Sequence, residues 1–383
     1  MNAILAIDSF KGCLTSEEAE SAASLAFGET DEFIRIPVSD GGEGFSRIVT
    51  KAAGGIFRSV RTVDPLGRSI SAEYGLIGGG RTAVIETAAA SGLTLVPEEM
   101  RNPLRATSYG TGEMIADALD YGVESILLGL GGSATNDGGT GMLQALGYRM
   151  STRQGYAMPG QAVLADITGI DDSHRHPLLK RVHICGLYDV DVPFCGKGGA
   201  TDMFSAQKGA GREMAEALEG WMYRLGAVYS SFSGRNVIGA PGSGAAGGLG
   251  GALAAILHAD MERGVSKVLD MAGMDISLDM DFDVIITGEG KADIQTLAGK
   301  APKGVLDYVR RHDRLRRRNP GRVCLIAGKV DDREELLQAG FDDVIQICPE
   351  GVPKEIAMDK DYASERIRRA VEGLIAGSPK PRQ

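Results

Sequence analysis

Long apolar runs are missing from this sequence, and none approaches the ~20 residues that a transmembrane helix needs. The first residues turn polar at Asp8, which is too soon for a secretory signal peptide. The five cysteines are odd in number and none forms a C-x-x-C pair, so the pattern does not fit a disulfide framework or a zinc site. We therefore expect a cytoplasmic protein with reduced thiols.

Positive charge is also scarce. The chain carries 41 Lys and Arg against 51 Asp and Glu, a net charge of −10, which disfavours nucleic acid or an anionic membrane as the main partner. Several catalytic motifs are absent too: the P-loop pattern G-x-x-x-x-G-K-[ST], the G-x-S-x-G of hydrolases and an H-x-x-x-H metal pair. What remains is a soluble globular chain of 383 residues, long enough for two or three domains.

Glycine, in contrast, is abundant. It supplies 54 of 383 residues, about twice the usual share of roughly 7%. The excess gathers in four clusters, at 41–44, 129–141, 196–199 and 242–251. Such clusters are typical of places where the backbone turns sharply or approaches a ligand.

The most informative stretch runs from Asp283 to Thr296. Residues 282–286 form a largely apolar, β-branched run that predicts a strand buried on both faces. We expect this strand to end at Thr287-Gly288-Glu289-Gly290, followed by the polar residues Asp293, Gln295, Thr296 and Lys300. Polar groups after a buried parallel strand lie at the carboxyl edge of the sheet, where open α/β sheets bind ligands.

Four more buried strands accompany it. The first two, at 3–7 and 33–38, each end in a carboxylate beside glycine: Asp8-Ser9-Phe10-Lys11-Gly12 and Ser39-Asp40-Gly41-Gly42-Glu43-Gly44. The others are expected at 323–327 and 343–347, with helices at 301–312, 332–339 and 361–376. We predict a flavodoxin-like parallel sheet of order 2-1-3-4-5, whose switch point brings the loop at 8–11 beside the loop at 287–296.

Residues 57–90 change to the period-two alternation of an antiparallel or mixed sheet. We therefore expect a large inserted α/β domain with a mixed sheet at 58–280, and a flavodoxin-like domain formed by 1–57 and 281–383. Inside the insertion, Thr107 to Gly112 should precede a helix, and a strand at 125–130 should lead into Gly131-Gly132-Ser133-Ala134-Thr135-Asn136-Asp137. A strand at 183–188 delivers Asp189 and Asp191, and residues 151–180 look irregular.

The lysines, carboxylates and glycine-rich loops at these expected strand ends suit phosphoryl transfer. That reaction needs cations and amides around phosphate, carboxylates for Mg²⁺ and a carboxylate to orient the attacking hydroxyl. Seven motifs, in order along nearly the whole chain, resemble the bacterial glycerate kinase family. They are DSFKGCLT (8–15), PVSDGGEG (37–44), DPLGR (64–68), TSYGTGE (107–113), LGGSATNDGG (130–139), GAAGGLG (244–250) and TGEG with DIQT and GKAP (287–302). The resemblance implies ATP-dependent phosphorylation of D-glycerate, usually at the 2-hydroxyl, giving 2-phosphoglycerate.

Site residues follow from these motifs and from the expected sheet edges. We assign catalysis to Lys11, Asp189 and Asp40, with Asp189 as the first candidate for the base. Substrate and phosphate contacts are assigned to Ser9, Gly41, Gly42, Glu43, Lys208, Thr287, Gly288, Glu289, Gly290, Gln295, Thr296 and Lys300. Nucleotide contacts are assigned to Thr111, Gly112, Gly131, Gly132, Ser133, Asn136, Asp137, Gly247 and Gly248. Mg²⁺, carried by ATP, is assigned to Glu289 and Asp293, and the chain is a candidate homo-oligomer.

One departure from the family pattern concerns substrate choice. Where the family usually has Cys-Asp-Val-x-Asn-Pro-Leu, this chain reads Tyr188 to Phe194 with Val192 in place of the asparagine, and Ser205-Ala206 replaces a Gly-Pro pair. Two alternatives therefore stand beside glycerate phosphorylation. One is a kinase for another small hydroxy acid, and the other is a non-catalytic module that binds a sugar acid.

Overall fold

A computed structural model describes residues 1–10, 12–39, 42, 44–158, 164–278, 282–316 and 322–376. The chain divides into unit 1, residues 1–39 with 265–383, and unit 2, residues 40–264. These divisions differ from the expected ones near residues 57 and 281. The first difference has a physical reason, because helix α2 (Phe45–Ala52) packs against strands of the unit 2 sheet.

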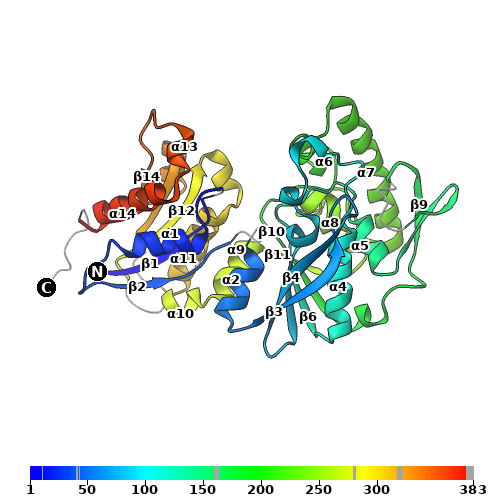
Figure 1. Ribbon diagram of the computed structural model, residues 1–383, viewed down its shortest axis with the longest axis horizontal. Coiled ribbons are helices and arrows are strands. Elements are labelled where there is room, and N and C mark those ends of the chain that lie inside the picture. Colours follow the sequence, from blue (N-terminus) through cyan, green and yellow to red (C-terminus); the bar gives the residue numbers. More distant parts are fainter. Residues whose placement is uncertain are drawn as a thin grey trace. The chain divides into compact units, whose positions relative to one another are not determined.

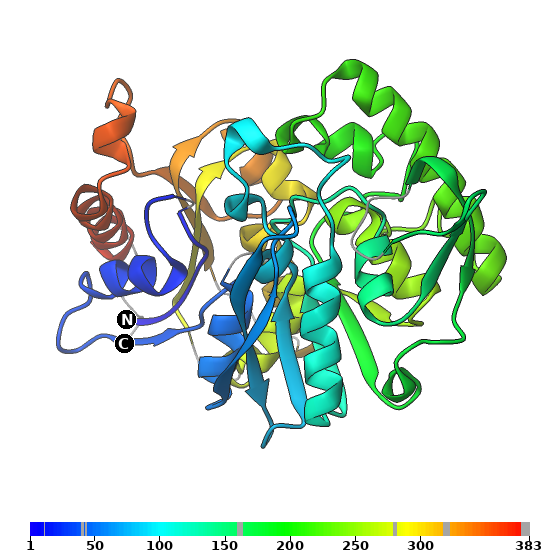
Figure 2. The same ribbon diagram turned by 45° about the vertical axis from the view of Figure 1, so that its right-hand side comes forward.

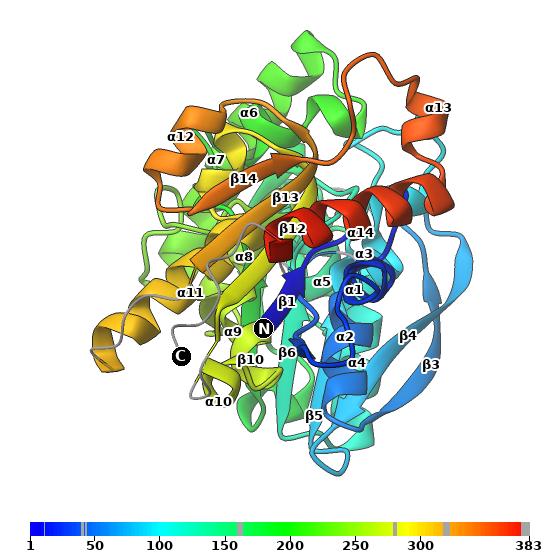
Figure 3. The same ribbon diagram turned by 90° about the vertical axis from the view of Figure 1, so that its left-hand side faces the viewer.

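Unit 1 is built on a five-stranded parallel sheet, as the buried apolar runs predict. Its described strands lie in the order β2-β1-β12-β13-β14, which is 2-1-3-4-5 when counted along this unit, and every neighbouring pair is parallel. Figure 3 shows β1, β12, β13 and β14 side by side. The flavodoxin-like order is therefore confirmed. The strands are β1 (Asn2–Ile7), β2 (Glu32–Arg35), β12 (Val284–Ala292), β13 (Arg322–Val330) and β14 (Asp343–Gln346).

Helices cover both faces of this sheet, because alternate strand residues point to opposite sides and apolar residues of the central strands are buried on each side. Leu5, Ile286 and Ile326 meet helices α1 and α14, which lie side by side in Figures 1 and 3. Ile4 and Ile285 face α9 and α11 instead. The helices are α1 (Ser16–Ser24), α9 (Gly264–Met271), α10 (Met274–Leu278), η6 (Ile294–Ala298), α11 (Ala301–Arg316), α12 (Arg333–Gln338), α13 (Lys354–Ala357) and α14 (Lys360–Ala376).

Strand β12 is longer than its sequence suggests. The expected end at Ile286 is wrong, because Thr287 to Ala292 continue the strand and pair with β13 through Val330. Gly288 is required inside this strand: a Cβ there would lie 2.7 Å from the carbonyl oxygen of Ile326. Gly288 therefore permits the close approach of β13 and does not end the strand.

Unit 2 contains a six-stranded mixed sheet of order β11-β10-β6-β5-β4-β3. The neighbours from β3 to β5 are antiparallel and those from β5 to β11 are parallel. Helix α4, the cyan helix near the centre of Figure 2, lies along the blue strands β3 and β4. The strands are β3 (Ile56–Val63), β4 (Ser69–Ile77), β5 (Thr82–Glu86), β6 (Ser125–Gly129), β10 (His183–Tyr188) and β11 (Asp260–Arg263).

The helices of unit 2 enclose one large apolar core. They are α3 (Thr87–Ser91), α4 (Tyr109–Tyr121), α5 (Thr140–Ala145), α6 (Ala200–Phe204), α7 (Arg212–Ser233) and α8 (Ala245–Ala255), with 3-10 turns η1 (Leu93–Leu95), η2 (Glu98–Met100), η3 (Leu164–Asp166), η4 (Pro177–Lys180) and η5 (Ala206–Lys208). Part of the stretch expected to be irregular forms a small antiparallel sheet. Its strands are β7 (Arg149–Thr152), β8 (Gly155–Tyr156) and β9 (Ile167–Asp171).

Candidate functional site

The carboxyl edge of the unit 1 sheet brings two predicted loops together. The amide of Asp8, which follows β1, donates to the carbonyl oxygen of Gly288 on β12 at 3.0 Å. The amide of Ser9 then donates to Asp8 Oδ1 at 2.7 Å, which turns the chain away from the sheet. The switch point between these strands is thus where the sheet order predicts it. Lys11 itself lies outside the described residues.

Glu289 is the buried carboxylate of this edge. Glu289 lies inside β12, three residues before its end, and Thr296 Oγ1 donates to one carboxylate oxygen at 2.6 Å while Lys300 Nζ donates to the other at 3.1 Å. Burial raises the pKa of Glu289, while Thr296 and the charge of Lys300 oppose that rise. Because both oxygens have donors, Glu289 holds Lys300 and Thr296 in place at the edge of the sheet.

Asp293 starts the short helix η6 and forms a capping box with Thr296. It also lies 2.9 Å from Lys291 Nζ and 3.7 Å from Lys300 Nζ. Burial works to raise the pKa of Asp293, but the hydrogen bond from Lys291 and the charge of Lys300 outweigh it and hold the pKa below its usual value. Gln295 is exposed, and its main-chain amide donates to Asp293 Oδ1 at 3.0 Å.

The other residues assigned to this edge are less accessible. Thr287 is fully buried in β12, and its hydroxyl has no hydrogen-bond partner among the described residues. Gly290 packs against β13: a Cβ on Gly328 would lie 2.5 Å from its carbonyl oxygen. Gly288 and Gly328 therefore allow β12 and β13 to pack closely, and Gly290 contributes its carbonyl oxygen to that contact.

A resident metal cage has no support here. Within the described residues no group of three or more His, Cys, Asp or Glu side chains is placed to hold a metal ion. Glu289 and Asp293, the predicted Mg²⁺ ligands, are instead paired with Lys300 and Lys291. In this structure each of the two carboxylates is therefore compensated by a lysine and not by a metal ion.

The carboxyl ends of β5, β6, β10 and β11 form a second edge, in unit 2. The loop after β6 is organised by Asp137, which is fully buried and accepts from Ser108 N and Oγ, both at 2.8 Å. Asp137 also accepts from the amides of Gly139 and Gly141 at 3.0 and 3.2 Å. Burial raises the pKa of Asp137, and these donors oppose that rise. Asp137 thus shapes the loop from within.

Lys208 is buried beside the same loop, with 3% of its surface exposed. Its ammonium group donates to Ser133 Oγ at 3.0 Å and to the carbonyl oxygen of Thr135 at 2.7 Å. Burial lowers the pKa of Lys208 to about 7, and the more distant charge of Asp137 offsets only part of this. Two of its three donors hold the loop, which leaves one for another acceptor.

Glycines let a second loop pack on the first. Ala246, Gly247 and Gly248 are all left-handed and interrupt helix α8. A Cβ on Gly247 would lie 2.0 Å from the carbonyl oxygen of Thr135, and the amide of Gly138 donates to Gly247 O at 3.0 Å. A left-handed alanine costs of order 1 kcal/mol, and such strain often occurs at functional sites.

The predicted nucleotide residues divide into two groups. Asn136 and Ser133 belong to the loop after β6, and Asn136 donates to Thr201 Oγ1 at 3.2 Å. Gly131 and Gly132 start this loop, where Gly132 takes a left-handed conformation with φ of 71°. Thr111 and Gly112, in contrast, lie inside α4, so the expectation that they precede the helix is wrong. The hydroxyl of Thr111 is hydrogen-bonded to the hydroxyl of Ser91, and a Cβ on Gly112 would lie 2.4 Å from the carbonyl oxygen of Met142.

Asp189 follows β10 directly, and its Oδ1 atom is buried. Val192, the departure from the family pattern, is also buried, with 7% of its surface exposed. A Cβ on Gly244 would lie 2.8 Å from Val192 Cγ1, and the Gly244 amide donates to Val192 O at 2.9 Å. Val192 therefore packs against the backbone at Gly244, just before α8.

Sequence reasoning missed Glu86, the last residue of β5. Its carboxylate accepts from the amides of Gly44 and Ser46 at 3.2 and 2.5 Å, so it fixes the start of α2. A carboxylate at the carboxyl end of an expected strand was the available signal. Gly42 is described and its carbonyl accepts from Phe45 N at 3.2 Å, whereas Asp40, Gly41 and Glu43 lie outside the described residues.

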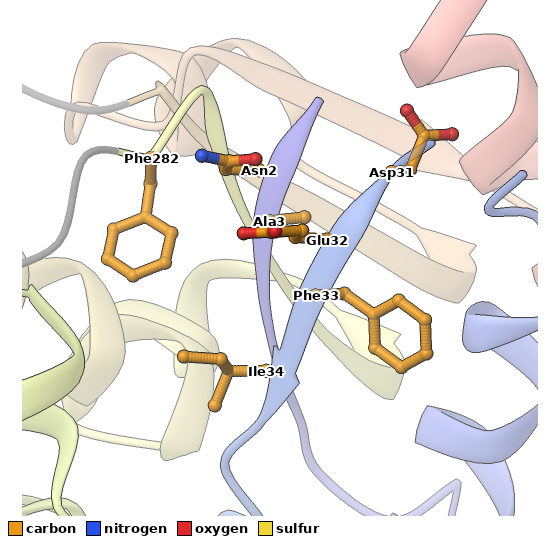
Figure 4. A pocket seen from close by; sticks show the side chains of 7 residues that line it. All are labelled: Asn2, Ala3, Asp31, Glu32, Phe33, Ile34 and Phe282. Atoms are coloured by element: carbon orange, nitrogen blue, oxygen red, sulfur yellow. The ribbon is translucent and has the colours of Figure 1, made fainter. Parts of the chain in front are cut away.

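A pocket lies at the amino ends of strands in the unit 1 sheet, away from the candidate site residues at the carboxyl ends. Figure 4 shows it around the starts of β1 and β2, with Phe33 and Ile34 on opposite sides of β2. Its lining residues are Asn2, Ala3, Asp31, Glu32, Phe33, Ile34 and Phe282. Ligands of open α/β sheets bind at the carboxyl ends of the strands, so we do not assign substrate to this pocket.

Residues 3–377 match the model of the glycerate kinase family. The chain belongs to that family. It is 40% identical over 381 residues to the glycerate kinase of Bacillus subtilis (strain 168), covering 98% of this chain and 97% of that protein. It is 38% identical over 352 residues to the glycerate 2-kinase of Escherichia coli (strain K12), covering 91% and 90%.

A solved structure agrees with this family membership. The crystal structure of a chain described as glycerate kinase 2 from Salmonella typhimurium LT2 matches with a TM-score of 0.80 at 39% identity, covering 98% of this chain and 97% of that one. The resemblance of the sequence motifs is thus confirmed, and the chain is a phosphotransferase. The alternative of a non-catalytic binding module is set aside. Among the described residues, no helix is both long and apolar enough to cross a membrane.

Proposed function

We propose that this enzyme transfers the γ-phosphoryl group of ATP to the 2-hydroxyl of D-glycerate, giving 2-phosphoglycerate and ADP. One observation carries the choice of hydroxyl: the 38% identity, over 91% of this chain, to a protein named glycerate 2-kinase. The burial of Val192 against Gly244 supports glycerate over a longer hydroxy acid, because the changed side chain is taken up by packing inside unit 2.

Asp189 is the proposed base. The hydroxyl of glycerate is a poor nucleophile, so a carboxylate within hydrogen-bond reach must orient it and accept its proton as the phosphoryl group arrives. Asp189 stands at the carboxyl end of a buried parallel strand, next in sequence to a turn with little freedom to move. Asp40 is the second candidate.

Positive groups are proposed to bind the anionic parts of the substrates. Lys11 would contact phosphate or the glycerate carboxylate, and Lys300 would do so from the edge of the unit 1 sheet, where Glu289 orients it. Lys208 retains one donor beside the loop after β6, which, with the turn at Gly247 and Gly248, is the proposed nucleotide site. Backbone amides and cations of this kind stabilise the charge that spreads over the transferred group.

Mg²⁺ is proposed to enter with ATP. When bound, it would neutralise charge on the β- and γ-phosphates. Asp293 and Glu289 remain the proposed protein contacts. Either carboxylate would have to exchange part of its present lysine pairing for the cation.

The test is ADP release over a panel of hydroxy acids: D-glycerate, L-glycerate, glycolate, D-lactate and a four-carbon analogue. Only compounds with a suitably placed 2-hydroxyl should turn over, and D-glycerate should have the highest kcat/KM. Glycolate controls for the loss of the 3-hydroxymethyl group while keeping the reacting hydroxyl. A higher kcat/KM for the four-carbon acid would instead support a kinase for another hydroxy acid.

A further inference from the structure

Arg263 is the last residue of strand β11 in unit 2, and its position in the sheet places it beside the proposed base. It ends β11, which pairs in parallel with β10, and its register partner is Tyr188. Asp189 is the next residue after Tyr188. The strand pairing alone therefore brings Arg263 to the start of the turn that carries Asp189.

The guanidinium of Arg263 contacts this turn at three points. One terminal nitrogen donates to the main-chain carbonyl of Asp189, and the other forms an ion pair with the carboxylate of Asp191. The same group lies over the ring of Tyr188, 5.6 Å from its centroid. A planar guanidinium can donate in two directions and stack at once, whereas a lysine ammonium cannot stack in this way.

The segment 242–244 also restricts the turn that follows β10. A Cβ on Gly242 would lie 2.9 Å from the ring of Tyr188, and one on Gly244 would lie 2.1 Å from the carbonyl oxygen of Pro193. The backbone of 242–244 therefore lies directly against the turn that follows β10. With Arg263 bonded to the turn as well, Asp189 has little room to shift.

We propose that Arg263 is a positioning residue for Asp189, which rests on the proposed role of Asp189 as the base. Its bonds go to the carbonyl of Asp189 and to the carboxylate of Asp191. The ion pair therefore fixes the turn through Asp191 and balances a negative charge two residues from the base. A like charge so close, left unpaired, would perturb the protonation of Asp189.

The experiment compares Arg263→Gln and Arg263→Lys with the wild type, using steady-state kinetics and hydrogen–deuterium exchange of the segment 188–194. We expect Arg263→Gln to lower kcat by about 10–100-fold with KM for ATP and glycerate nearly unchanged, because a misplaced catalytic group costs rate more than binding. Exchange in 188–194 should become faster, and Arg263→Lys should lie between. Arg212→Gln is the matched control, since that arginine is 92% exposed on α7.

Two further variants keep the outcomes distinct. Asp191→Asn removes the ion pair but leaves the contact between Arg263 and the Asp189 carbonyl, so it should lower kcat less than Arg263→Gln does. The double variant that combines Asp191→Asn with Arg263→Gln should be no slower than Arg263→Gln alone. The positioning role is overturned if Arg263→Gln keeps the wild-type kcat, changes only KM, or leaves exchange in 188–194 unchanged. If Asp189→Asn retains turnover, the proposed base fails instead, whatever the exchange data show.

Discussion

Replacing Lys208 by methionine should stabilise unit 2 at low pH. Lys208 is buried, has no carboxylate within ion-pair distance among the described residues, and has a pKa lowered by burial to about 7 from an ordinary value of 10.5. At about 1.36 kcal/mol per pKa unit, keeping the ammonium charged below pH 7 costs the folded state about 5 kcal/mol. The methionine side chain has a similar length and removes that cost.

The sign of the pH dependence follows from proton counts. Between pH 7 and pH 10 the unfolded chain keeps the lysine proton and the folded chain has lost it, so the free energy of unfolding of the wild type rises with pH. By pH 9 the cost has fallen to about 2 kcal/mol. Losing the bonds to Ser133 and Thr135 costs the variant about 2 kcal/mol at any pH. Lys208→Met should therefore be about 3 kcal/mol more stable at pH 6 and nearly equal to the wild type at pH 9.

Urea unfolding followed by tryptophan fluorescence measures this directly. Trp221 is the only tryptophan in the sequence, and it lies in α7 against the core of unit 2, the unit to which Lys208 also belongs. Lys197→Met, at an exposed position of the same unit, is the control and should show no such pH-dependent difference. A Lys208→Met variant that is less stable at pH 6, or whose difference from the wild type does not vary with pH, would refute the reasoning.

Three shorter predictions follow. Asp189→Asn should keep ATP affinity and melting temperature but lower turnover at least a hundredfold, roughly 2.7 kcal/mol of barrier; unchanged turnover with a lower melting temperature would move the base to Asp40. Thr287→Val should raise the free energy of unfolding by about 1 kcal/mol, since the buried hydroxyl has no hydrogen-bond partner in the part of the chain that the structure describes; a decrease would reveal one, and a fall in kcat/KM would reveal a substrate contact. Removal of divalent cations with EDTA should abolish turnover and Mg²⁺ should restore it, whereas full activity in the chelator would contradict a cation carried by ATP.

The parallel sheet was predictable because strands buried on both faces leave a continuous apolar run that polar flanks interrupt sharply. The end of β12 was not, because Thr287 and Glu289 alternate with glycines as a loop does, and only the pairing with β13 shows that they remain in a strand. The small sheet of β7, β8 and β9 was missed for a related reason. Its strands are short and mostly only partly buried, so they carry no clear apolar periodicity.

Side-chain partners explain the remaining differences. Sequence spacing placed Lys208 and Asp137 near glycine loops, but not that both are buried and hold the loop after β6 from within. Arg263 gave no local signal, because its contacts depend on the pairing of two strands that are far apart along the chain. The order of the motifs identified the family. Burial and hydrogen bonding then distinguished the residues that shape the loops from those with hydrogen-bond donors still available to a ligand.

The central claim is tested most directly by identifying the product. Incubating the enzyme with ATP, Mg²⁺ and D-glycerate and recording ³¹P and ¹³C spectra distinguishes phosphate on the 2-hydroxyl from phosphate on the 3-hydroxyl through its coupling to the carbon that bears it. The proposed function predicts ADP and 2-phosphoglycerate in equal amounts. Accumulation of 3-phosphoglycerate would contradict the choice of hydroxyl, and ADP formation without any phosphorylated glycerate would contradict glycerate as the acceptor.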